Sequence, residues 1–163
     1  MTSAGTQDKA ALRAELVERL SADLDAMERA HQTTREGATH EEAKPENDKD
    51  TRALEQTYLA RGQAVRVEQL RGELADIKAL AVRDLAAGAA ATLGTLVTVE
   101  EDGVESLLFL VPAGGGISLA GGSVQAITPR SPLGRALLGR RAGDDVEIVV
   151  AGKERALRIE RVG

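Results

Sequence analysis

The chain has 163 residues, with 21 lysines and arginines against 26 aspartates and glutamates, and its formal net charge is −5. This balance argues against a nucleic-acid-binding protein held by phosphate contacts, and the absence of cysteine excludes disulfide frameworks, zinc fingers and thiol proteases. No stretch of about 18 apolar residues and no apolar leader is present, so we expect a cytoplasmic protein of one or two modest domains that does not enter a membrane. Tyr58 and Phe109 are the only aromatic residues, which disfavours an aromatic-lined pocket or base stacking.

Residues 8 to 86 predict two long helices that pair as an antiparallel hairpin. Apolar residues recur there at steps of three and four, which are coiled-coil intervals, and the polar segment 36–49 between the two series would let the chain reverse. The second helix should run from about Pro45 to Ala86. Its seam should thin upstream of Val67, because Ala53, Gln56, Ala60 and Gln63 fill much of it and only Leu54, Tyr58, Leu59 and Val65 are large. The series are Leu12, Leu16, Val17, Leu20, Leu24 and Met27, then Val67, Leu70, Leu74, Ile77 and Ala81.

From Ala87 the composition changes to small, glycine-rich and β-branched residues. The segment 87–94 predicts a hinge, and five short strand-like runs follow it, with turns at Asp102-Gly103 and Ala151-Gly152. Between the strands, Ser131 is a helix cap before Pro132, and Gly139 closes that short helix. The predicted fold class is therefore α+β, with an arm over residues 1–90, an acidic tip at about 36–50 and a globular domain over 91–163.

The tip carries the most suggestive chemistry, because five carboxylates lie within ten residues, at positions 41, 42, 46, 48 and 50. Such oxygens could share a Mg²⁺ ion that is completed by water and substrate phosphates. The same carboxylates can also be explained by helix structure alone. Pro45 suits the first turn of a helix, where the helix dipole favours acids such as Glu46 and Asp48. The spacing leaves both readings open.

Other candidate sites have a weaker pattern. His31 and His40 are nine residues apart, without the spacing of four that places two imidazoles on one helical face, so they read as surface histidines. The run Gly114–Gly116 lacks the Gly-Lys-Ser/Thr of a phosphate loop and reads as a connection between strands.

Two segments resemble the bacterial Gre (GreA/GreB) transcription elongation factors. The sequence from Ser131 to Val162, SPLGRALLGRRAGDDVEIVVAGKERALRIERV, is similar to the family's C-terminal domain, with its Ser-Pro-Leu/Ile segment, short helix and Gly-Asp-x-Val strand. The sequence from Pro45 to Leu70 is similar to the start of the family's second arm helix. The resemblance implies a coiled-coil hairpin joined to an FKBP-like sheet domain.

The resemblance also implies a function in transcription. Gre factors dock on RNA polymerase and insert the arm into its secondary channel, where tip acids help hold the second Mg²⁺ and the polymerase cleaves backtracked RNA. It implies Glu46 as a residue that assists the polymerase and shares its Mg²⁺, with Glu42 or Asp48 as the second acid. Asn47, Ser131 and Pro132 are implied as binding residues. The chain would have no cofactor of its own, would not itself be an enzyme, and would meet DNA and nascent RNA only through the polymerase.

One residue departs from the family pattern. Aligned on Glu46-Asn47, the position of the family's first tip aspartate is occupied by Ala43, whose methyl group cannot bind magnesium. Two alternatives therefore stay open: a regulator that occupies the channel without promoting cleavage, and, from another class, an FKBP-like prolyl isomerase or chaperone. Prolyl isomerase activity requires a pocket of aromatic side chains, and Phe109 alone cannot form such a pocket.

Overall fold

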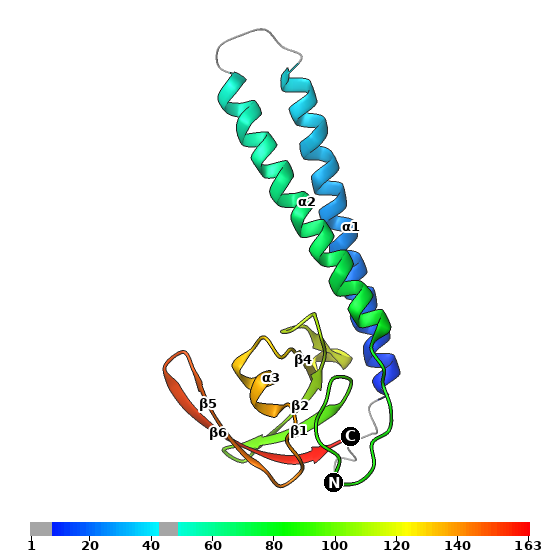
Figure 1. Cartoon of the computed structure of the whole chain (residues 1–163), viewed down its shortest axis with the longest axis vertical. Helices are drawn as coiled ribbons and strands as arrows, with labels where there is room; N and C mark the ends of the chain where they lie inside the picture. The colour runs from blue at the N-terminus through cyan, green and yellow to red at the C-terminus, as the bar shows by residue number, and fades with distance from the viewer. Residues whose placement is uncertain (1–7, 43–48) are drawn as a thin grey trace. The chain divides into compact units, whose positions relative to one another are not determined.

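The computed structural model describes residues 8–42 and 49–163 (Figure 1), and within them it confirms the predicted α+β class: two long helices are followed by a small sheet domain with a short helix. No helix in the described ranges is long and apolar enough to cross a membrane. The elements are α1 (Lys9–Glu42), α2 (Lys49–Ala79), β1 (Leu96–Glu101), β2 (Val104–Leu110), β3 (Ser118–Leu119), the 3-10 turn η1 (Ala120–Gly122), β4 (Val124–Ile127), α3 (Pro132–Leu137), β5 (Asp145–Val150) and β6 (Lys153–Val162).

The chain forms two compact units whose boundaries fall inside the long helices. One unit, the hairpin unit, is Glu18–Leu74; the other, the sheet unit, joins residues up to Val17 with Ala75–Gly163. The first turns of α1 and the last turn of α2 therefore belong to the same compact unit as the sheet.

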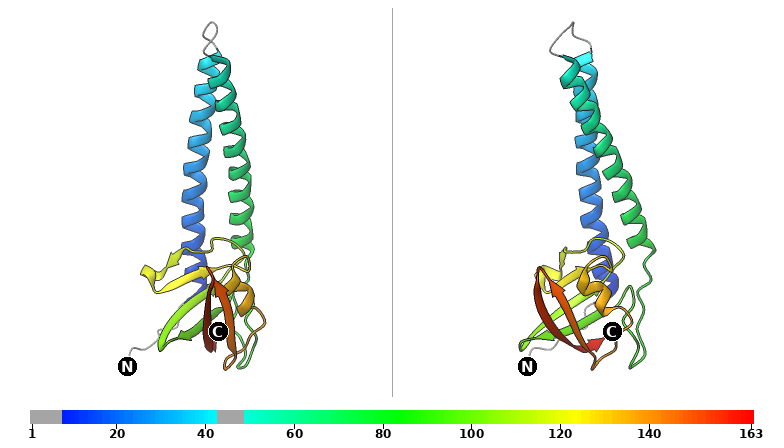
Figure 2. Two further views of the ribbon diagram at one scale, coloured as in Figure 1. Left: turned by 90° about the vertical axis from the view of Figure 1, so that its left-hand side faces the viewer. Right: turned by 60° about the vertical axis from the view of Figure 1, so that its left-hand side comes forward.

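Within the hairpin unit, α1 and α2 lie side by side in all three views (Figures 1 and 2). Their pairing is antiparallel: Glu28 of α1 binds Arg71 of α2, with 2.7 Å between Oε1 and Nη2, whereas Thr39, later in α1, lines a groove with Thr57, earlier in α2. Four apolar residues of the predicted seam are buried: Leu20, Val67, Leu70 and Leu74. Among the described residues from Ser21 to Arg66, none is fully buried, in agreement with the predicted thinning of the seam.

Small and amide side chains fill the thin part of the seam, as the sequence predicted. Leu54, Tyr58, Leu59 and Val65 are 53–63% exposed, and the positions that face α1 are filled by half-buried Ala53, Gln56, Ala60 and Gln63. The predicted filling of the seam is confirmed, because small and amide side chains continue the helical period of Val67 toward the tip, whereas the four large residues fall outside it and are exposed.

The helix bounds also differ from the prediction at two points. Helix α1 continues to Glu42, through residues that were assigned to the chain reversal, and α2 ends at Ala79 instead of Ala86. Beyond Ala79 the chain packs against α1: Leu80 is buried, and its carbonyl accepts a hydrogen bond from Arg13 Nη1 at 2.7 Å. Lys9 Nζ donates to the Arg83 carbonyl in the same way. These side chains satisfy carbonyls that a longer helix would have bonded internally.

The segment predicted as a hinge is bonded to the sheet unit. Ala91 is fully buried; its N–H donates to the Arg140 carbonyl at 2.7 Å, and its carbonyl accepts from Gly139 N–H at 2.8 Å. Arg141 Nη1 donates to the Gly88 carbonyl. Backbone pairing therefore fixes this stretch beside the end of α3.

The six strands form one sheet in the order β3-β4-β2-β1-β6-β5, in which only the β2–β4 pair is parallel. The predicted turns at Asp102-Gly103 and Ala151-Gly152 connect β1 to β2 and β5 to β6, and all four residues have positive φ. Two-residue turns of this kind match the twist of antiparallel strands. Sequence patterning missed β3, which has only two residues.

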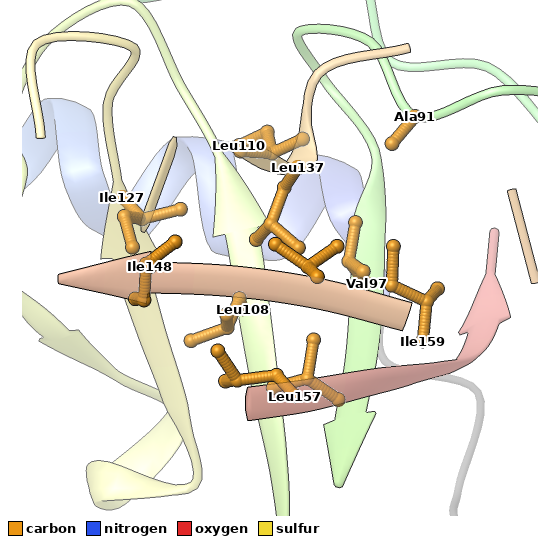
Figure 3. Close-up of a cluster of buried hydrophobic side chains, with 11 residues drawn as sticks. Ala91, Val97, Leu108, Leu110, Ile127, Leu137, Ile148, Leu157 and Ile159 are labelled. Atoms are coloured by element: carbon orange, nitrogen blue, oxygen red, sulfur yellow. The ribbon is translucent and has the colours of Figure 1, made fainter. Parts of the chain in front are cut away.

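Both faces of the sheet are covered. Figure 3 shows one face, where strand residues such as Val97, Leu108, Leu110 and Ile159 form a buried cluster with Leu137 of α3. Alternation along β2 places Phe109 on the opposite face, where it is also fully buried. Helix α1 reaches the strands and loops of this unit: Glu15 Oε2 accepts from Ala120 N–H at 2.9 Å, and a Cβ on Gly114 would lie 2.8 Å from Leu16 Cδ1.

Candidate functional site

The tip between the long helices connects Glu42, the last residue of α1, to Lys49, the first residue of α2. The side chain of Glu42 lies outside the described residues, as do Glu46, Asn47 and Asp48 entirely. The structure therefore defines where α1 ends and where α2 begins, and the predicted tip residues lie at or between these two points in the sequence. Their roles in binding and in sharing Mg²⁺ stay predictions.

The second predicted site, at the start of α3, is built as the sequence indicated. Ser131 is the N-cap of α3: its hydroxyl accepts from Gly134 N–H at 3.0 Å and donates to the Thr128 carbonyl at 3.0 Å. Pro132 occupies the first helical turn and is exposed, and Gly139 follows the helix with a φ of +78°. Because the Ser131 hydroxyl already donates one hydrogen bond and accepts another within the cap, exposed Pro132 is the more available of the two residues for contact with a partner.

A shallow groove of about 330 Å³ lies between α1 and α2 within the hairpin unit. It forms where small residues replace large ones in the seam, and His31, Arg35 and Arg61 contribute its polar groups. The Nδ1 atom of His31 is buried without a hydrogen-bond partner among the described residues, so this histidine is part of the seam and not the surface residue that its spacing predicted. The steps of four and three that link Leu20, Leu24 and Met27 on α1 continue to His31, and this spacing was the sequence signal that could have placed it in the seam.

The described side chains offer little for metal or aromatic chemistry. No group of three or more His, Cys, Asp or Glu side chains among them is placed to hold a metal ion. Phe109 is fully buried and Tyr58 lies on a helix of the other unit, so neither lines an aromatic pocket in the described sheet unit. The glycines at 114–116 connect β2 to β3, as predicted.

One charged pair in the sheet unit has a clear electrostatic effect. Arg155 Nε donates to Glu101 Oε1 at 2.7 Å and Nη2 donates to Oε2 at 2.5 Å. These hydrogen bonds hold the pKa of the Glu101 carboxyl below its ordinary value and raise the pKa of the Arg155 guanidinium. The pair joins the end of β1 to the start of β6 and reads as a structural contact.

Comparison with known families assigns the sheet unit. Residues 87–163 match the sequence model of the family described as transcription elongation factor, GreA/GreB, C-term. This domain belongs to the GreA/GreB family. The predicted resemblance is thereby confirmed on the residues that carried it most specifically, since Ser131 to Val162 lie inside the matched range. No curated protein shows significant similarity to the sequence.

Solved structures give a second comparison. GreA factor homolog 1 (Gfh1) of Thermus thermophilus is 20% identical, with 90% of this chain and 94% of that chain covered and a TM-score of 0.40. Gfh1 of Thermus aquaticus is 22% identical, covering 89% and 92%, also at 0.40. The GreA/GreB factor of Nitrosomonas europaea is 24% identical, covering 57% and 77%, at 0.37.

The GreA/GreB domain includes Ser131 and Pro132 but none of the tip residues. Glu42, Glu46, Asn47 and Asp48 precede the matched range. The family match therefore includes the two residues predicted to dock, whose role stays a prediction, while the tip depends on the resemblance of Pro45 to Leu70 alone.

Proposed function

We propose that this chain is a Gre-type factor of RNA polymerase: the GreA/GreB domain docks on the polymerase near the mouth of its secondary channel, and the α1–α2 hairpin enters that channel. The observation that supports the proposal is that a single chain contains both the GreA/GreB domain and a helical hairpin. A GreA/GreB domain at residues 87–163 follows a hairpin of two long antiparallel helices whose connection is rich in carboxylates. Such a factor needs two parts: a domain that binds at the channel mouth and a narrow pair of helices that can be inserted into the channel.

Under this proposal the chemistry is the polymerase's own. Phosphodiester hydrolysis by two metal ions needs ligands for a weakly held second Mg²⁺ and an oriented water molecule. Glu46 would supply one carboxylate, with Glu42 or Asp48 as the second, and Asn47 beside them. A cation held through one or two carboxylates takes its remaining ligands from water and substrate phosphates, so the ion would be shared with the polymerase and bound only weakly by this chain alone.

A second candidate function follows from Ala43. This alanine stands where the family pattern has a tip aspartate, so the tip has one suitably placed carboxylate fewer. A factor with such a tip would occupy the channel and compete with other channel-binding proteins without stimulating cleavage. Both candidates require the same docking and differ only in what the tip does.

A cleavage assay on a backtracked elongation complex separates the two. With cleavage stimulation, the protein shortens the RNA from its 3′ end faster than polymerase alone, and Glu46→Ala removes the effect while leaving polymerase binding unchanged. Glu55→Ala, an exposed acid further along α2, is the matched control and should keep full stimulation. No stimulation with retained binding assigns the non-cleaving function, and failure to bind core polymerase rejects both.

A further inference from the structure

Exposed apolar side chains are concentrated on one stretch of α2. The described residues contain seven large hydrophobic side chains that are exposed, and four of them, Leu54, Tyr58, Leu59 and Val65, fall within twelve residues of the hairpin unit. Isolated exposed apolar residues need no explanation, but a contiguous group of them marks an interaction surface. We call Leu54, Tyr58 and Val65 the α2 stripe; Leu59 projects about 140° from Leu54 and lies outside it.

Helical geometry places the α2 stripe away from α1. At about 100° per residue, Tyr58 and Val65 both project within about 40° of Leu54. The buried seam residues Val67, Leu70 and Leu74 point to the other side of the helix. The described part of α1 has no large exposed apolar residue, so the hairpin unit has one apolar outer face and one polar outer face.

The stripe contains one positive charge. Arg61 lies between Tyr58 and Val65 along the helix, at the edge of the stripe nearest the α1–α2 groove that it also lines, and it is exposed. No ion pair joins Arg61 to any described residue, although Arg66 and Arg71 on the same helix both have glutamate partners. The surface therefore suits an apolar partner that also presents an acceptor or a carboxylate.

Resting on the proposed function, we infer that the α2 stripe binds an apolar segment of the polymerase channel wall that places a carboxylate opposite Arg61. The hairpin would then enter in one rotational orientation, with the α2 face against the wall and the α1 face toward water. The stripe thereby determines which way the tip residues point when they reach the active site.

A second copy of this chain fits the stripe less well. The stripe spans only about 16 Å at 1.5 Å per residue, whereas a self-standing coiled coil needs an apolar seam over three to four heptads. The same face continues as Glu68, Gly72 and Asp76, which cannot extend such a seam. Antiparallel self-pairing centred on the stripe would also bring the two Arg61 side chains close together, and like charges at that distance repel.

The test replaces the stripe by polar residues that favour helix. The triple variant Leu54→Gln, Tyr58→Gln, Val65→Gln is compared with wild type for binding to core polymerase, by anisotropy of a label attached to the GreA/GreB domain. The matched control is Ala22→Gln, Ala26→Gln, Ala30→Gln, which creates the same three residues on exposed positions of α1. We expect at least tenfold weaker binding for the stripe variant and less than a twofold change for the control, with equal helicity by circular dichroism.

Two further measurements make the outcome decisive. A photo-crosslinking amino acid at position 58 should form an adduct with a large polymerase subunit, and the same group at position 29 on α1 should not. Arg61→Glu should weaken binding as the triple variant does.

Unchanged binding by the stripe variants, with wild type bound, overturns this inference and leaves the proposed function standing. Wild type that does not bind polymerase overturns both, and a dimer of the free protein that the stripe variant abolishes reassigns the stripe to a second copy.

Discussion

Arg155 and Glu101 show how a single pair fixes the geometry between two strands. The guanidinium binds both carboxylate oxygens, and such paired hydrogen bonds add directional specificity to the charge attraction. Because Arg155 stabilises the charged form of Glu101, the pKa of this carboxyl is lower in the folded chain than in the unfolded chain. A lowered carboxyl pKa contributes stability above the unfolded pKa, and that contribution is lost as pH falls through the folded pKa.

Glu101→Gln should therefore reduce stability at pH 7 and have a shrinking effect below about pH 4, where carboxyls of ordinary pKa become protonated. Denaturant midpoints of wild type and variant, measured across this pH range, check the prediction. Glu105→Gln, an exposed acid on the neighbouring strand, is the control and should show no such pH-dependent difference. A Glu101 effect of constant size at all pH values would contradict the assignment.

Glycines in the two helices differ sharply in what a methyl group would meet. A Cβ on Gly134 in α3 would lie 2.0 Å from the carbonyl oxygen of Thr128, while a Cβ on Gly72 in α2 would meet nothing within 4 Å. Gly134→Ala should destabilise the chain by about 3 kcal/mol, because backbone must move to accept the methyl group. Gly72→Ala should stabilise it by up to about 1 kcal/mol, the difference in helix propensity. Chemical unfolding of both variants is the measurement, and equal effects would be inconsistent with the packing of α3.

At the scale of elements, the end of α2 depends on side chains of α1. Arg13 donates to the Leu80 carbonyl and Lys9 to the Arg83 carbonyl, so residues early in the chain satisfy acceptors some seventy positions later. A helix end without such partners leaves carbonyl groups unsatisfied.

Arg13→Met should cost about 2 kcal/mol of stability, because it keeps the apolar stem and removes a charged donor from a partly buried carbonyl. Arg29→Met on an exposed position of α1 should change stability by less than about 0.5 kcal/mol. Thermal or denaturant unfolding compares the two, and similar losses would mean that the Leu80 carbonyl finds another partner.

Sequence patterning predicted the elements whose signals are local. Ser131, Pro132 and Gly139 defined α3 through cap chemistry alone. The turn at Asp102-Gly103 followed from two residue types that accept positive φ, and the turn at Ala151-Gly152 from its glycine, although Ala151 also has a positive φ. The end of α2 was misplaced because residues 80–86 favour helix by composition, and the contacts that stop it come from α1. The two-residue β3 has no alternation to detect, and the parallel β2–β4 pairing depends on contacts distant in sequence.

The two parts of the candidate site also differ in how far local sequence rules predict them. Local rules predicted the structure of Ser131 and Pro132, whereas the tip residues rest on a resemblance that Ala43 interrupts. Helical spacing alone placed Ala53, Ala60 and Gln63 in the seam, and their half-buried side chains confirm this. The outward position of Leu54, Tyr58 and Val65 follows from the packing of α2 against α1, which the structure adds.

At the scale of the whole molecule, the sheet unit depends on helix ends that lie outside the GreA/GreB match. Leu12 and Leu16 of α1 and Ile77 of α2 are buried, and all belong to the sheet unit. A fragment cut at the family boundary would lose these side chains and expose the apolar residues that they cover.

We expect the isolated fragment Ala87–Gly163 to bind an apolar dye and to unfold at a lower denaturant concentration than the full chain. In the full chain, Leu16→Ala should cost about 3 kcal/mol, since Leu16 is fully buried. Leu24→Ala, at a half-buried position in the hairpin unit, should cost less. A fragment as stable as the full chain, or a Leu16 effect no larger than that of Leu24, would show that the helix ends contribute little to the sheet unit.

The near absence of aromatic residues gives this protein a built-in optical reporter. The chain has no tryptophan, its single tyrosine is in the hairpin unit, and its single phenylalanine is in the sheet unit. Ultraviolet emission of the unmodified chain therefore comes almost wholly from Tyr58, while strand ellipticity reports on the other unit. Following both signals during one denaturation would show directly whether the two units melt in a single cooperative step or one after the other.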